Sequence, residues 1–471
     1  MGKSTGFKEY SRQLRKERPI GERIKDYKEI YESFSGNDIK LQAARCMNCG
    51  TPFCNWACPL GNLSPDFNNM VYNGHLRKAY KRLILTSIFP EFTGRLCPAL
   101  CEGSCTLGVN RQPVSVRDIE LYIIEKAYEK GWVTPHIPSI RTGKKVAIIG
   151  SGPSGLAAAA FLNMLGHFVT VFERSDEVGG LLRYGIPDFK LEKHIIDRRI
   201  SLMEQEGIIF RTGEYIGKNR SIFDISDKYD ALLLAGGSTV PRDLNIEGRE
   251  LEGVYFAVDY LTQQNRKNAG KSIASNEISA KGKTVVIIGG GDTGSDCIGT
   301  AVRQGAKKVY QYEIMPKPPE VRDETMPWPD FPKTLKTTSS HEEGCIRKWC
   351  ISAKKIIGEG GKVKSVISKD VSWEKDANGM TMKEIQGSEF EQQADMIILC
   401  MGFLHCEHES IADRLNLQFD AKGNIKTDEN YMASIDGMFA AGDMRTGQSL
   451  VVRAISDGIN AAKCIDKYLM K

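Results

Sequence analysis

The sequence of 471 residues lacks any long uninterrupted apolar run. Its apolar stretches, such as residues 156–165, are too short and too rich in alanine to span a bilayer, which takes about 20 apolar residues. The first six residues, Met-Gly-Lys-Ser-Thr-Gly, have no apolar core of the kind that a signal peptide carries. We therefore expect a cytoplasmic protein that does not enter a membrane.

The chain also lacks a strong excess of charge of either sign. It has 64 Lys and Arg against 59 Asp and Glu, and the two signs are interspersed. Proteins that bind nucleic acids usually carry a basic patch, so we expect no nucleic acid partner. A hydrophobic content of 41% is typical of a globular protein, and the length predicts two or three domains.

The pattern along the chain changes after residue 138. Before it, a helix is expected near residues 24–34, and helical patterns follow at 65–85 and 114–130. Residues 134–138, Thr-Pro-His-Ile-Pro, predict an extended linker, because proline disfavours helix in the residue before it. Beyond the linker, strand–helix–strand patterns at 145–173 and 283–313 predict two separate dinucleotide folds with parallel sheets.

A G-x-G-x-x-G motif directly follows the first predicted strand, at Gly150, Gly152 and Gly155. The first glycine permits a tight turn, the second lets a pyrophosphate approach the backbone, and the third lets the helix pack on the strand. Free N–H groups at the helix start would face the phosphates. Glu173 ends the next strand, where its carboxylate can accept hydrogen bonds from ribose hydroxyls. The combination predicts a dinucleotide site.

The C-terminal segment indicates which dinucleotide binds there. An apolar strand ends at Gly442 and Asp443, and a helical pattern follows at 448–462. This arrangement resembles flavoproteins with two dinucleotide folds, in which the Asp contacts the ribityl chain and the helix start faces the flavin. There the helix dipole favours negative charge on the reduced flavin. The alternative is a strand, turn and helix that only close the sheet; the pairing with the first glycine motif favours FAD.

A second glycine motif follows the strand at 283–289. Its position in the middle of the chain suits a nicotinamide domain inserted into the FAD domain, although a glycine turn without a ligand is the alternative. The residues expected to contact the nicotinamide coenzyme here are Gly289, Gly291, Asp292, Thr293 and Gly294.

The choice between NADH and NADPH depends on the end of the next strand. Glu313 stands there, and an acidic residue at this place favours the free 2′-hydroxyl of NADH. A 2′-phosphate would need an arginine, and Lys317 and Arg322 are only loosely placed for that role. The sequence favours NADH without deciding between the two.

Thirteen cysteines are many for a cytoplasmic chain, where disulfides rarely persist. Cys-Pro pairs after closely spaced cysteines are typical of ferredoxins, although this spacing differs from theirs. Zinc is the alternative, but only the first two cysteines have the C-x2-C spacing that zinc sites usually pair. Seven thiolates are one short of two clusters with four each, so one cluster has another ligand or three cysteines are spare. The clustered residues are Cys46, Cys49, Cys54, Cys58, Cys97, Cys101 and Cys105.

With these residues the chain resembles the family of small (beta) subunits of glutamate synthase over nearly its whole length. The cysteine and FAD motifs are shared with the N-terminal half of dihydropyrimidine dehydrogenase. The opening segment and the proline-rich segments are more particular to glutamate synthase. The segments that carry the resemblance are residues 2–7, 45–54, 94–105, 179–187, 315–320 and 327–332.

The resemblance implies two 4Fe–4S clusters with interleaved ligands. The missing eighth ligand is expected within residues 113–120, where dihydropyrimidine dehydrogenase has a glutamine and this chain has Glu120. Carboxylates are unusual cluster ligands, and the alternative is an ordinary exposed helix glutamate. One set of ligands would be Cys46, Cys49, Cys54 and Cys105. The other would be Cys58, Cys97 and Cys101 with Glu120.

The FAD contacts are expected on the first glycine motif, on the segments that follow it and on the C-terminal helix start. These residues are Gly150, Gly152, Pro153, Ser154, Gly155, Glu173, Arg174, Gly180, Leu181, Arg183, Gly236, Gly442, Asp443, Ser449, Leu450, Val451 and Ala454.

We therefore expect an α/β protein with three domains. A helical iron–sulfur domain would occupy residues 1–135, and a doubly wound FAD-binding domain residues 136–255 and 400–471. The NAD(P)H-binding domain, also doubly wound, would be inserted at 256–399. No catalytic residue is expected beyond the bound flavin and nicotinamide, because hydride transfer needs positioning more than acid–base side chains.

The resemblance implies an electron-input subunit. It would oxidise NAD(P)H with FAD and relay electrons through the clusters to a large (alpha) subunit, which makes glutamate from glutamine and 2-oxoglutarate. The glutaminase domains of such synthases use a cysteine just after Met1. This chain has no cysteine there, so it should not release ammonia from glutamine itself. One alternative is a subunit of a ferredoxin-linked transhydrogenase or another electron-transfer complex, and a second is a zinc-stabilised nucleotide-binding scaffold.

Overall fold

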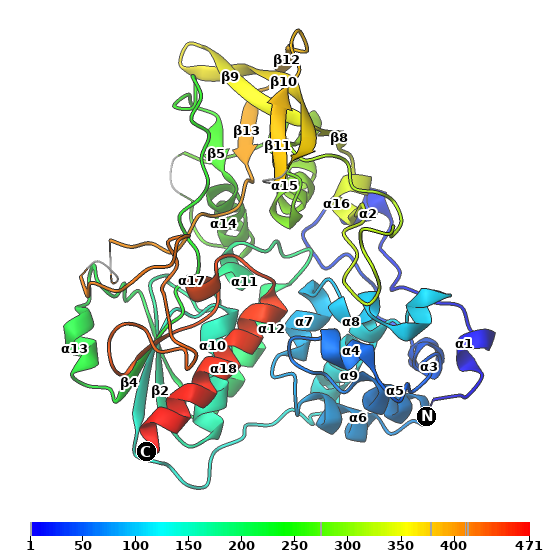
Figure 1. The fold of residues 1–471 in the computed structure, drawn as a ribbon, viewed down its shortest axis with the longest axis vertical. Coiled ribbons are helices and arrows are strands. Elements are labelled where there is room, and N and C mark those ends of the chain that lie inside the picture. The colour runs from blue at the N-terminus through cyan, green and yellow to red at the C-terminus, as the bar shows by residue number, and fades with distance from the viewer. Residues whose placement is uncertain (1, 274–275, 377–378, 410, 412–413) are drawn as a thin grey trace.

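The computed structural model describes residues 2–273, 276–376, 379–409, 411 and 414–471. A helical N-terminal part lies beside one parallel sheet and below a second one (Figure 1). A 3-10 turn at Thr106–Val109 precedes the last of its helices. The helices are α1 (Gly6–Glu9), α2 (Ile20–Arg23), α3 (Gly36–Ala44), α4 (Phe53–Ala57), α5 (Ser64–Tyr72), α6 (Leu76–Leu83), α7 (Pro90–Leu96), α8 (Leu100–Gly103) and α9 (Val116–Glu129).

Two of the three helix predictions for this part needed correction. The helix expected near residues 24–34 is wrong, because this segment forms turns and bends and then an isolated bridge: Tyr31 bridges Glu17, and Ile30 N–H donates to the carbonyl of Phe189. The pattern at 65–85 forms two helices, since Gly74 adopts a φ of +77° between them. The third prediction is confirmed by α9.

The first parallel sheet has the strand order β14-β4-β1-β2-β3. Each β-branched run predicted between residues 145 and 173 forms a strand, and the alanine-rich segment forms the helix that crosses between them. The strands are β1 (Lys145–Ile149), β2 (Phe168–Glu173), β3 (Ile209–Thr212), β4 (Ala231–Leu234) and β14 (Met438–Ala440). The helices are α10 (Pro153–Met164), α11 (Leu181–Tyr184), α12 (Lys193–Gln205), α13 (Ile222–Ser226), α17 (Asp443–Thr446) and α18 (Val451–Leu469).

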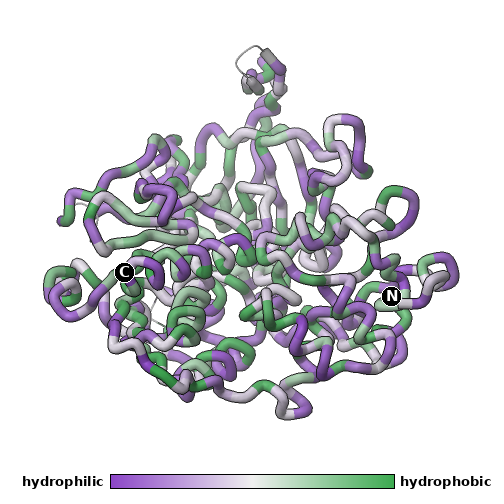
Figure 2. Tube along the Cα trace, turned by 60° about the horizontal axis from the view of Figure 1, so that its bottom comes forward, coloured by the Kyte–Doolittle hydropathy of each residue, from purple (hydrophilic) through white to green (hydrophobic). Residues whose placement is uncertain are grey.

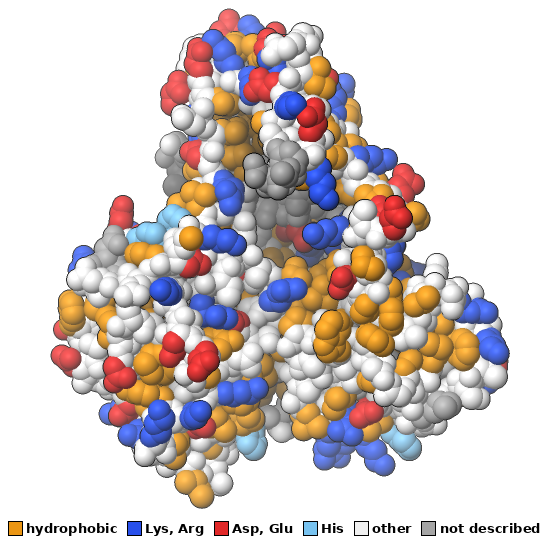
Figure 3. Space-filling model, in the orientation of Figure 1, with side chains coloured by type: hydrophobic (Ala, Val, Ile, Leu, Met, Phe, Trp, Pro, Cys, Tyr) orange, Lys and Arg blue, Asp and Glu red, His pale blue; other side chains and the backbone are white. Residues whose placement is uncertain are grey.

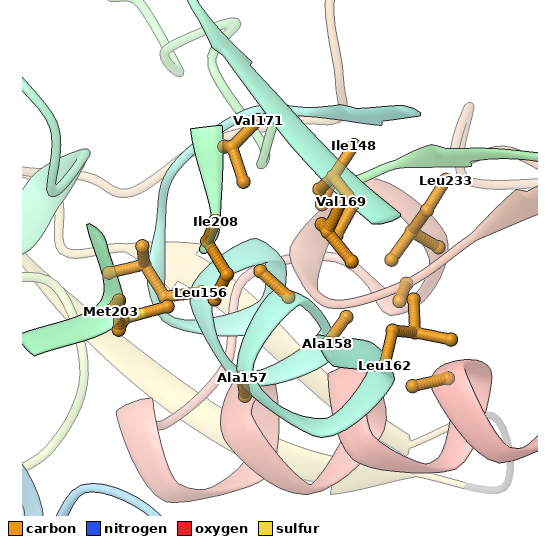
Figure 4. Packing of buried hydrophobic residues seen from close by; sticks show 14 of the residues in the cluster. Ile148, Leu156, Ala157, Ala158, Leu162, Val169, Val171, Met203, Ile208 and Leu233 are labelled. Atoms are coloured by element: carbon orange, nitrogen blue, oxygen red, sulfur yellow. The ribbon is translucent and has the colours of Figure 1, made fainter. Parts of the chain in front are cut away.

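The core of this unit lies between the sheet and α10 (Figure 4). Ile148 and Val171 from the strands and Leu156 from α10 are all fully buried there. The small side chains of α10 let α18 approach closely: a Cβ added to Gly458 would lie 2.1 Å from the carbonyl oxygen of Ser154. The close packing fixes the start of α18 beside the first glycine motif.

The second parallel sheet has the order β5-β13-β6-β7-β8. Hydrophobic stretches run through the interior of both sheets, whereas hydrophilic stretches dominate the outer loops (Figure 2). The predicted boundary between residues 255 and 256 falls inside β5, and the domain limits stay a prediction. The strands are β5 (Val254–Phe256), β6 (Thr284–Ile288), β7 (Lys308–Glu313), β8 (Ile346–Trp349) and β13 (Met396–Leu399). The helices are α14 (Ala257–Asn268), α15 (Asp292–Arg303) and α16 (Ser339–Glu342).

An antiparallel sheet that the sequence did not predict extends from this unit at the top of Figure 1. Its central strand β10 pairs with the three others. The strands are β9 (Ile351–Glu359), β10 (Lys362–Asp376), β11 (Gly379–Glu384) and β12 (Phe390–Gln393).

The N-terminal segment is tied to the second parallel sheet by buried charges. Arg23 is 1% exposed, its Nε lies 2.7 Å from an oxygen of Glu343, and a second nitrogen pairs with Glu17. Glu343 also pairs with Arg303 of α15, and both side chains are almost fully buried. Because neither arginine can reach water, their positive charges are balanced by the paired carboxylates of Glu343 and Glu17.

No helix among the described residues is long and apolar enough to cross a membrane. On the face seen in Figure 3, Lys and Arg side chains are scattered among Asp and Glu. This mixture agrees with the small net charge of the sequence.

Candidate functional site

A cavity of about 560 Å³ opens between the two parallel sheets, at the carboxyl ends of their strands. The turn after β1 lines it from one side, and Thr293 of α15 lines it from the other. Gly236 after β4 and Cys400 after β13 complete the wall between them. Carboxyl strand ends are where doubly wound folds bind their ligands. The second glycine motif reaches this cavity through Thr293, whereas Gly289, Gly291, Asp292 and Gly294 do not line it.

The first glycine turn has the geometry that its motif predicted. Gly150 adopts a φ of +109°, and an added Cβ would lie 2.4 Å from the carbonyl oxygen of Ala235. At Gly155 an added Cβ would lie 2.0 Å from the carbonyl oxygen of Gly150, so the helix can pack there only without a side chain. Nothing lies within 4 Å of the corresponding point at Gly152, which leaves room for a pyrophosphate at the start of α10.

Glu173 stands beside this turn at the end of β2. One carboxylate oxygen accepts from the backbone N–H of Ser151 at 3.2 Å, and the other accepts from that of Ser175 at 2.8 Å. The residue is 6% exposed, so these donors fix the carboxylate at the cavity wall. The hydroxyl of Ser151 also donates to the first of these oxygens, so the oxygen bound by Ser175 is the one that retains a lone pair for a ribose hydroxyl.

The opposite end of the cavity is formed by the C-terminal segment. Asp443 follows β14, and the hydroxyl of Ser449 donates to its carboxylate at 2.8 Å. Burial raises the pKa of Asp443 to about 6. Helix α18 begins at Val451, and Val451 and Ala454 line the cavity together with Ser449. The helix start therefore faces the cavity, as the flavin prediction required.

The structure brings most of the residues predicted to contact FAD to this one cavity. Gly155, Gly442 and Leu450 support its wall without lining it, and Arg183 points elsewhere, because its guanidinium pairs with Glu177 and Asp197. The FAD contacts themselves stay predictions. The residues that line the cavity are Gly150, Gly152, Pro153, Ser154, Glu173, Arg174, Gly180, Leu181, Gly236, Asp443, Ser449, Val451 and Ala454.

Sequence reasoning missed several side chains of this cavity. Tyr184 lines it from the end of α11, and Tyr215 and Glu407 line it from two separate loops. Glu407 accepts from the hydroxyl of Tyr215 and lies 3.4 Å from a nitrogen of Arg174. No local motif marks these loops, since tertiary folding alone brings them together.

The second glycine turn repeats the geometry of the first. Gly289 has a φ of +124°, and an added Cβ would lie 2.3 Å from the carbonyl oxygen of Cys400. Gly291 faces open space before α15 begins at Asp292. Glu313 at the end of β7 accepts from the backbone N–H of Gly290 at 2.6 Å. A carboxylate thus stands where the adenosine ribose of a coenzyme would lie.

The seven clustered cysteines form two sets around two small cavities. The outer cysteine set consists of Cys46, Cys49, Cys54 and Cys105, surrounded by apolar side chains such as Phe53. Asn48, between the first two, adopts a left-handed conformation with a φ of +51° that wraps the chain around the cavity. Such backbone strain persists only where the surrounding structure holds it in place, as at functional sites.

The inner cysteine set consists of Cys58, Cys97 and Cys101, and Glu120 of α9 completes its cavity. Glu120 is 6% exposed and accepts from the amide of Asn62 at 2.9 Å. Burial raises the pKa of Glu120 to about 7. The alternative of an exposed helix glutamate is therefore wrong.

The surroundings of the cysteine sulfurs suit thiolates that bind a metal group larger than a single ion. The backbone N–H groups of Leu60 and Asn62 hydrogen-bond to Cys58, while burial raises the pKa of Cys58 to about 11 and that of Cys54 to about 12. Thiols of this kind lose their protons when a metal binds. Within the part of the chain that the structure describes, no three His, Cys, Asp or Glu side chains converge closely enough for a single metal ion.

The inner cysteine set lies against the wall of the large cavity. Val452 lines the inner set's cavity, and its neighbour Val451 lines the large one. Ser456, one turn further along α18, donates to the carbonyl of Pro59 at 2.8 Å. The outer set has no lining residue from α18, so the three cavities follow one another in a fixed order.

Two families match the chain. Residues 144–458 match the pyridine nucleotide-disulphide oxidoreductase family. Residues 23–132 match the family described as dihydropyrimidine dehydrogenase domain II, 4Fe-4S cluster. The second match covers both cysteine sets and Glu120.

Similar proteins extend over nearly the whole chain. The glutamate synthase [NADPH] small chain of Mycobacterium tuberculosis is 47% identical over 470 residues, which cover 99% of this chain and 96% of that protein. The glutamate synthase [NADPH] small chain of Bacillus subtilis is 44% identical, with 100% and 99% covered. The glutamate synthase [NADH] of Schizosaccharomyces pombe is 44% identical over 99% of this chain, which corresponds to 23% of that longer protein.

The fold of the two parallel sheets also occurs in solved structures. FprA from Mycobacterium tuberculosis, in its His57Gln form, superposes with a TM-score of 0.56 at 18% identity. The match covers 70% of this chain and 85% of FprA. At this identity the likeness shows the shared fold alone.

Proposed function

The chain belongs to the glutamate synthase small-chain family, and on that premise we propose that it is the electron-input subunit of a glutamate synthase. It oxidises a nicotinamide coenzyme with FAD and delivers electrons to a large chain that makes glutamate from glutamine and 2-oxoglutarate. The observation that carries the proposal is the single cavity that the first glycine turn and Thr293 of the second glycine motif both line, with the inner cysteine set at its wall.

FAD would be held by the residues of the first sheet and the C-terminal helix. The start of α10 would bind the pyrophosphate, Glu173 the adenosine ribose and Asp443 the ribityl chain. The start of α18 would face the flavin ring, where its free N–H groups favour negative charge. The bound flavin supplies the chemistry of accepting a hydride and releasing single electrons.

Two 4Fe–4S clusters would be held by the inner and outer cysteine sets, with Glu120 as the eighth ligand. Each set surrounds its own buried cavity, and backbone N–H groups point at the sulfurs. Arg117 also lines the inner cavity and donates to the carbonyl of Cys97 at 3.2 Å. Its buried positive charge would offset part of the negative charge of a thiolate-bound cluster.

The coenzyme that we propose is NADH. The carboxylate of Glu313 would accept hydrogen bonds from both hydroxyls of the adenosine ribose, and it would repel a 2′-phosphate. Arg322 cannot offset this repulsion, because its guanidinium donates to the carbonyls of Met326, Asp330 and Gly103. Relatives with NADPH and with NADH in their names occur at similar identity, so this choice depends on the residues of the chain.

The partner would be a glutamate synthase large chain. In the longer Schizosaccharomyces pombe relative, the matching region is part of one polypeptide, which supports a close association between the two functions. A cytoplasmic location belongs to the same proposal, since all thirteen cysteines are free thiols, as a reducing compartment would keep them.

Anaerobic reduction of the purified protein tests the cofactors and the coenzyme together. We expect NADH to bleach the flavin bands and the broad iron–sulfur absorbance, and NADPH to do so far more slowly. A protein without flavin and iron would refute the redox function. Co-purification with a partner other than a glutamate synthase large chain would leave the redox function intact and refute the assignment to glutamate synthesis.

A further inference from the structure

A proline-rich loop, residues 315–336, connects the nicotinamide-binding unit with the cysteine-rich part. It leaves the end of β7 and descends to α4 and α8, as the yellow-green segment of Figure 1 shows. The loop contains the segments 315–320 and 327–332, which the sequence comparison set apart from the iron–sulfur and FAD motifs. The electron pathway proposed above gives it no role.

The loop first meets the cysteine-rich part next to Cys54. The ring of Trp328 packs on the ring of Phe53, with centroids 4.5 Å apart and planes tilted by 57°. Phe53 precedes Cys54 in α4 and lines the cavity of the outer cysteine set. Trp328 therefore covers a side chain that forms the wall of the outer cavity.

The same loop also holds the segment that leads to Cys105. The hydroxyl of Ser104 donates to the carbonyl of Pro329 at 2.6 Å. At Gly103 an added Cβ would lie 2.7 Å from the ring of Phe331, so the loop packs directly against the end of α8. Cys54 and Cys105 belong to the same set, and the loop fixes the neighbours of both.

The loop is held in shape by its own contacts. Arg322 donates to the carbonyls of Met326 and Asp330 at 2.9 and 2.8 Å, and through a second nitrogen to that of Gly103 at 3.0 Å. Met326 is 9% exposed. The indole nitrogen of Trp328 is buried and has no hydrogen-bond partner among the described residues. An apolar, unsolvated contact at this place suits a cover over the outer set.

We propose that Trp328 is a positioning residue that closes the solvent side of the outer iron–sulfur site and thereby sets its reduction potential. The inference relies on the proposed function, in that the outer cysteine set must hold a cluster. Adding one electron makes a thiolate-bound cluster more negative. Exclusion of water disfavours that more charged state, so a covered cluster has a lower potential than an exposed one.

Replacing Trp328 by alanine tests the proposal in the complete, anaerobically purified protein. Potentials are measured by redox titration followed by EPR, and loss of iron in air is followed by its absorbance. Cys54→Ser identifies the signal of the outer cluster. In Trp328→Ala we expect that signal to shift to a less negative potential and the outer cluster to lose iron severalfold faster. The inner cluster and the rate of flavin reduction by NADH should stay unchanged.

Two further variants separate a cover from a general structural effect. Trp328→Phe keeps an aromatic ring on Phe53 and should restore the wild-type potential. Trp56→Ala removes an indole that lies in the same helix as Cys54 but is 74% exposed, and it should change neither signal. An unchanged outer potential in Trp328→Ala, or an equal shift of both clusters, would overturn the inference. Wild-type protein without clusters would instead refute the proposed function.

Discussion

Replacing Glu313 by alanine should weaken the use of NADH and spare that of NADPH. The carboxylate is held at the end of β7 by two backbone donors, Gly290 N–H at 2.6 Å and Met315 N–H at 2.9 Å. A fixed carboxylate can accept from the ribose without first being ordered, so little of the interaction energy is lost to entropy. Such a bond to a charged group contributes about 1.5–3 kcal/mol.

These energies predict the size of the effect. At about 1.36 kcal/mol for each factor of ten, kcat/KM for NADH should fall roughly 10- to 150-fold in Glu313→Ala. For NADPH the lost hydrogen bond is offset by the removal of repulsion, which for unit charges about 4 Å apart near a protein surface is about 4 kcal/mol. Glu313→Gln keeps a hydrogen-bond acceptor without the negative charge. It should reduce the preference for NADH over NADPH and retain more activity with NADH than Glu313→Ala does.

The assay is anaerobic flavin reduction with each coenzyme, compared between wild type and variants at equal FAD content. Glu320→Ala serves as the control, because this carboxylate lies on the loop that follows β7 and its side chain is 76% exposed. Equal losses with NADH and NADPH would refute the reasoning, since they would mean that Glu313 supports the fold of the turn and does not distinguish the coenzymes.

Three other predictions concern single buried side chains. Glu120→Ala should lower the iron content towards half with FAD retained, whereas Glu129→Ala on the exposed side of α9 should not; full iron content would exclude the ligand role. Glu343→Ala leaves the buried Arg303 without its paired carboxylate, while Arg23 keeps Glu17, and should cost about 3–5 kcal/mol in chemical denaturation, against almost nothing for the half-exposed Glu342. Burial lowers the pKa of His341 to about 4 in the folded protein. As the pH falls, the His341 imidazole of the unfolded chain is therefore protonated before that of the folded protein. Stability should fall as pH drops from 6.5 to 4, by up to about 3 kcal/mol, and His341→Gln should flatten this dependence in pH-dependent urea titrations.

The features that the sequence predicted best are those that depend on neighbours in the chain. Gly150 and Gly289 stand at tight turns with a positive φ, each directly after a strand and shortly before a helix. The glycine motif therefore predicts the strand before it and the helix after it. The same holds for Glu173 and Glu313, which end the second strand of each unit.

The two cysteine sets could be predicted only in part from the spacing of the cysteines along the chain. Spacing indicated a metal group but left open whether one cluster or two would form. The grouping of Cys54 with Cys105, across 51 residues, came from family resemblance. The structure gathers the same two sets because α4, α8 and α9 pack together.

Other parts of the fold could not be predicted from any local sequence pattern. Strand β10 is flanked by strands on both sides yet carries three Ser and four Lys, and its buried residues include Ser365 and Ser368, so its hydrophobic period is weak. Residues 24–34 looked helical by their local pattern, but Tyr31 and Ile30 bond to distant backbone, which overrides local preference. The loop side chains Tyr215 and Glu407 meet only through tertiary folding.

The ion network around Arg23 has a consequence for the order of assembly on the ribosome. Its carboxylate partner Glu343 is 320 residues further along the chain. At about 5–20 residues per second, the arginine waits roughly 15–60 s before that partner is synthesised. Until then Arg23 can pair with Glu17, but the segment that carries it lacks the second carboxylate of its buried network. The first residues to leave the ribosome are thus among the last to reach their native place, and the chain can complete its N-terminal part only after its middle has folded.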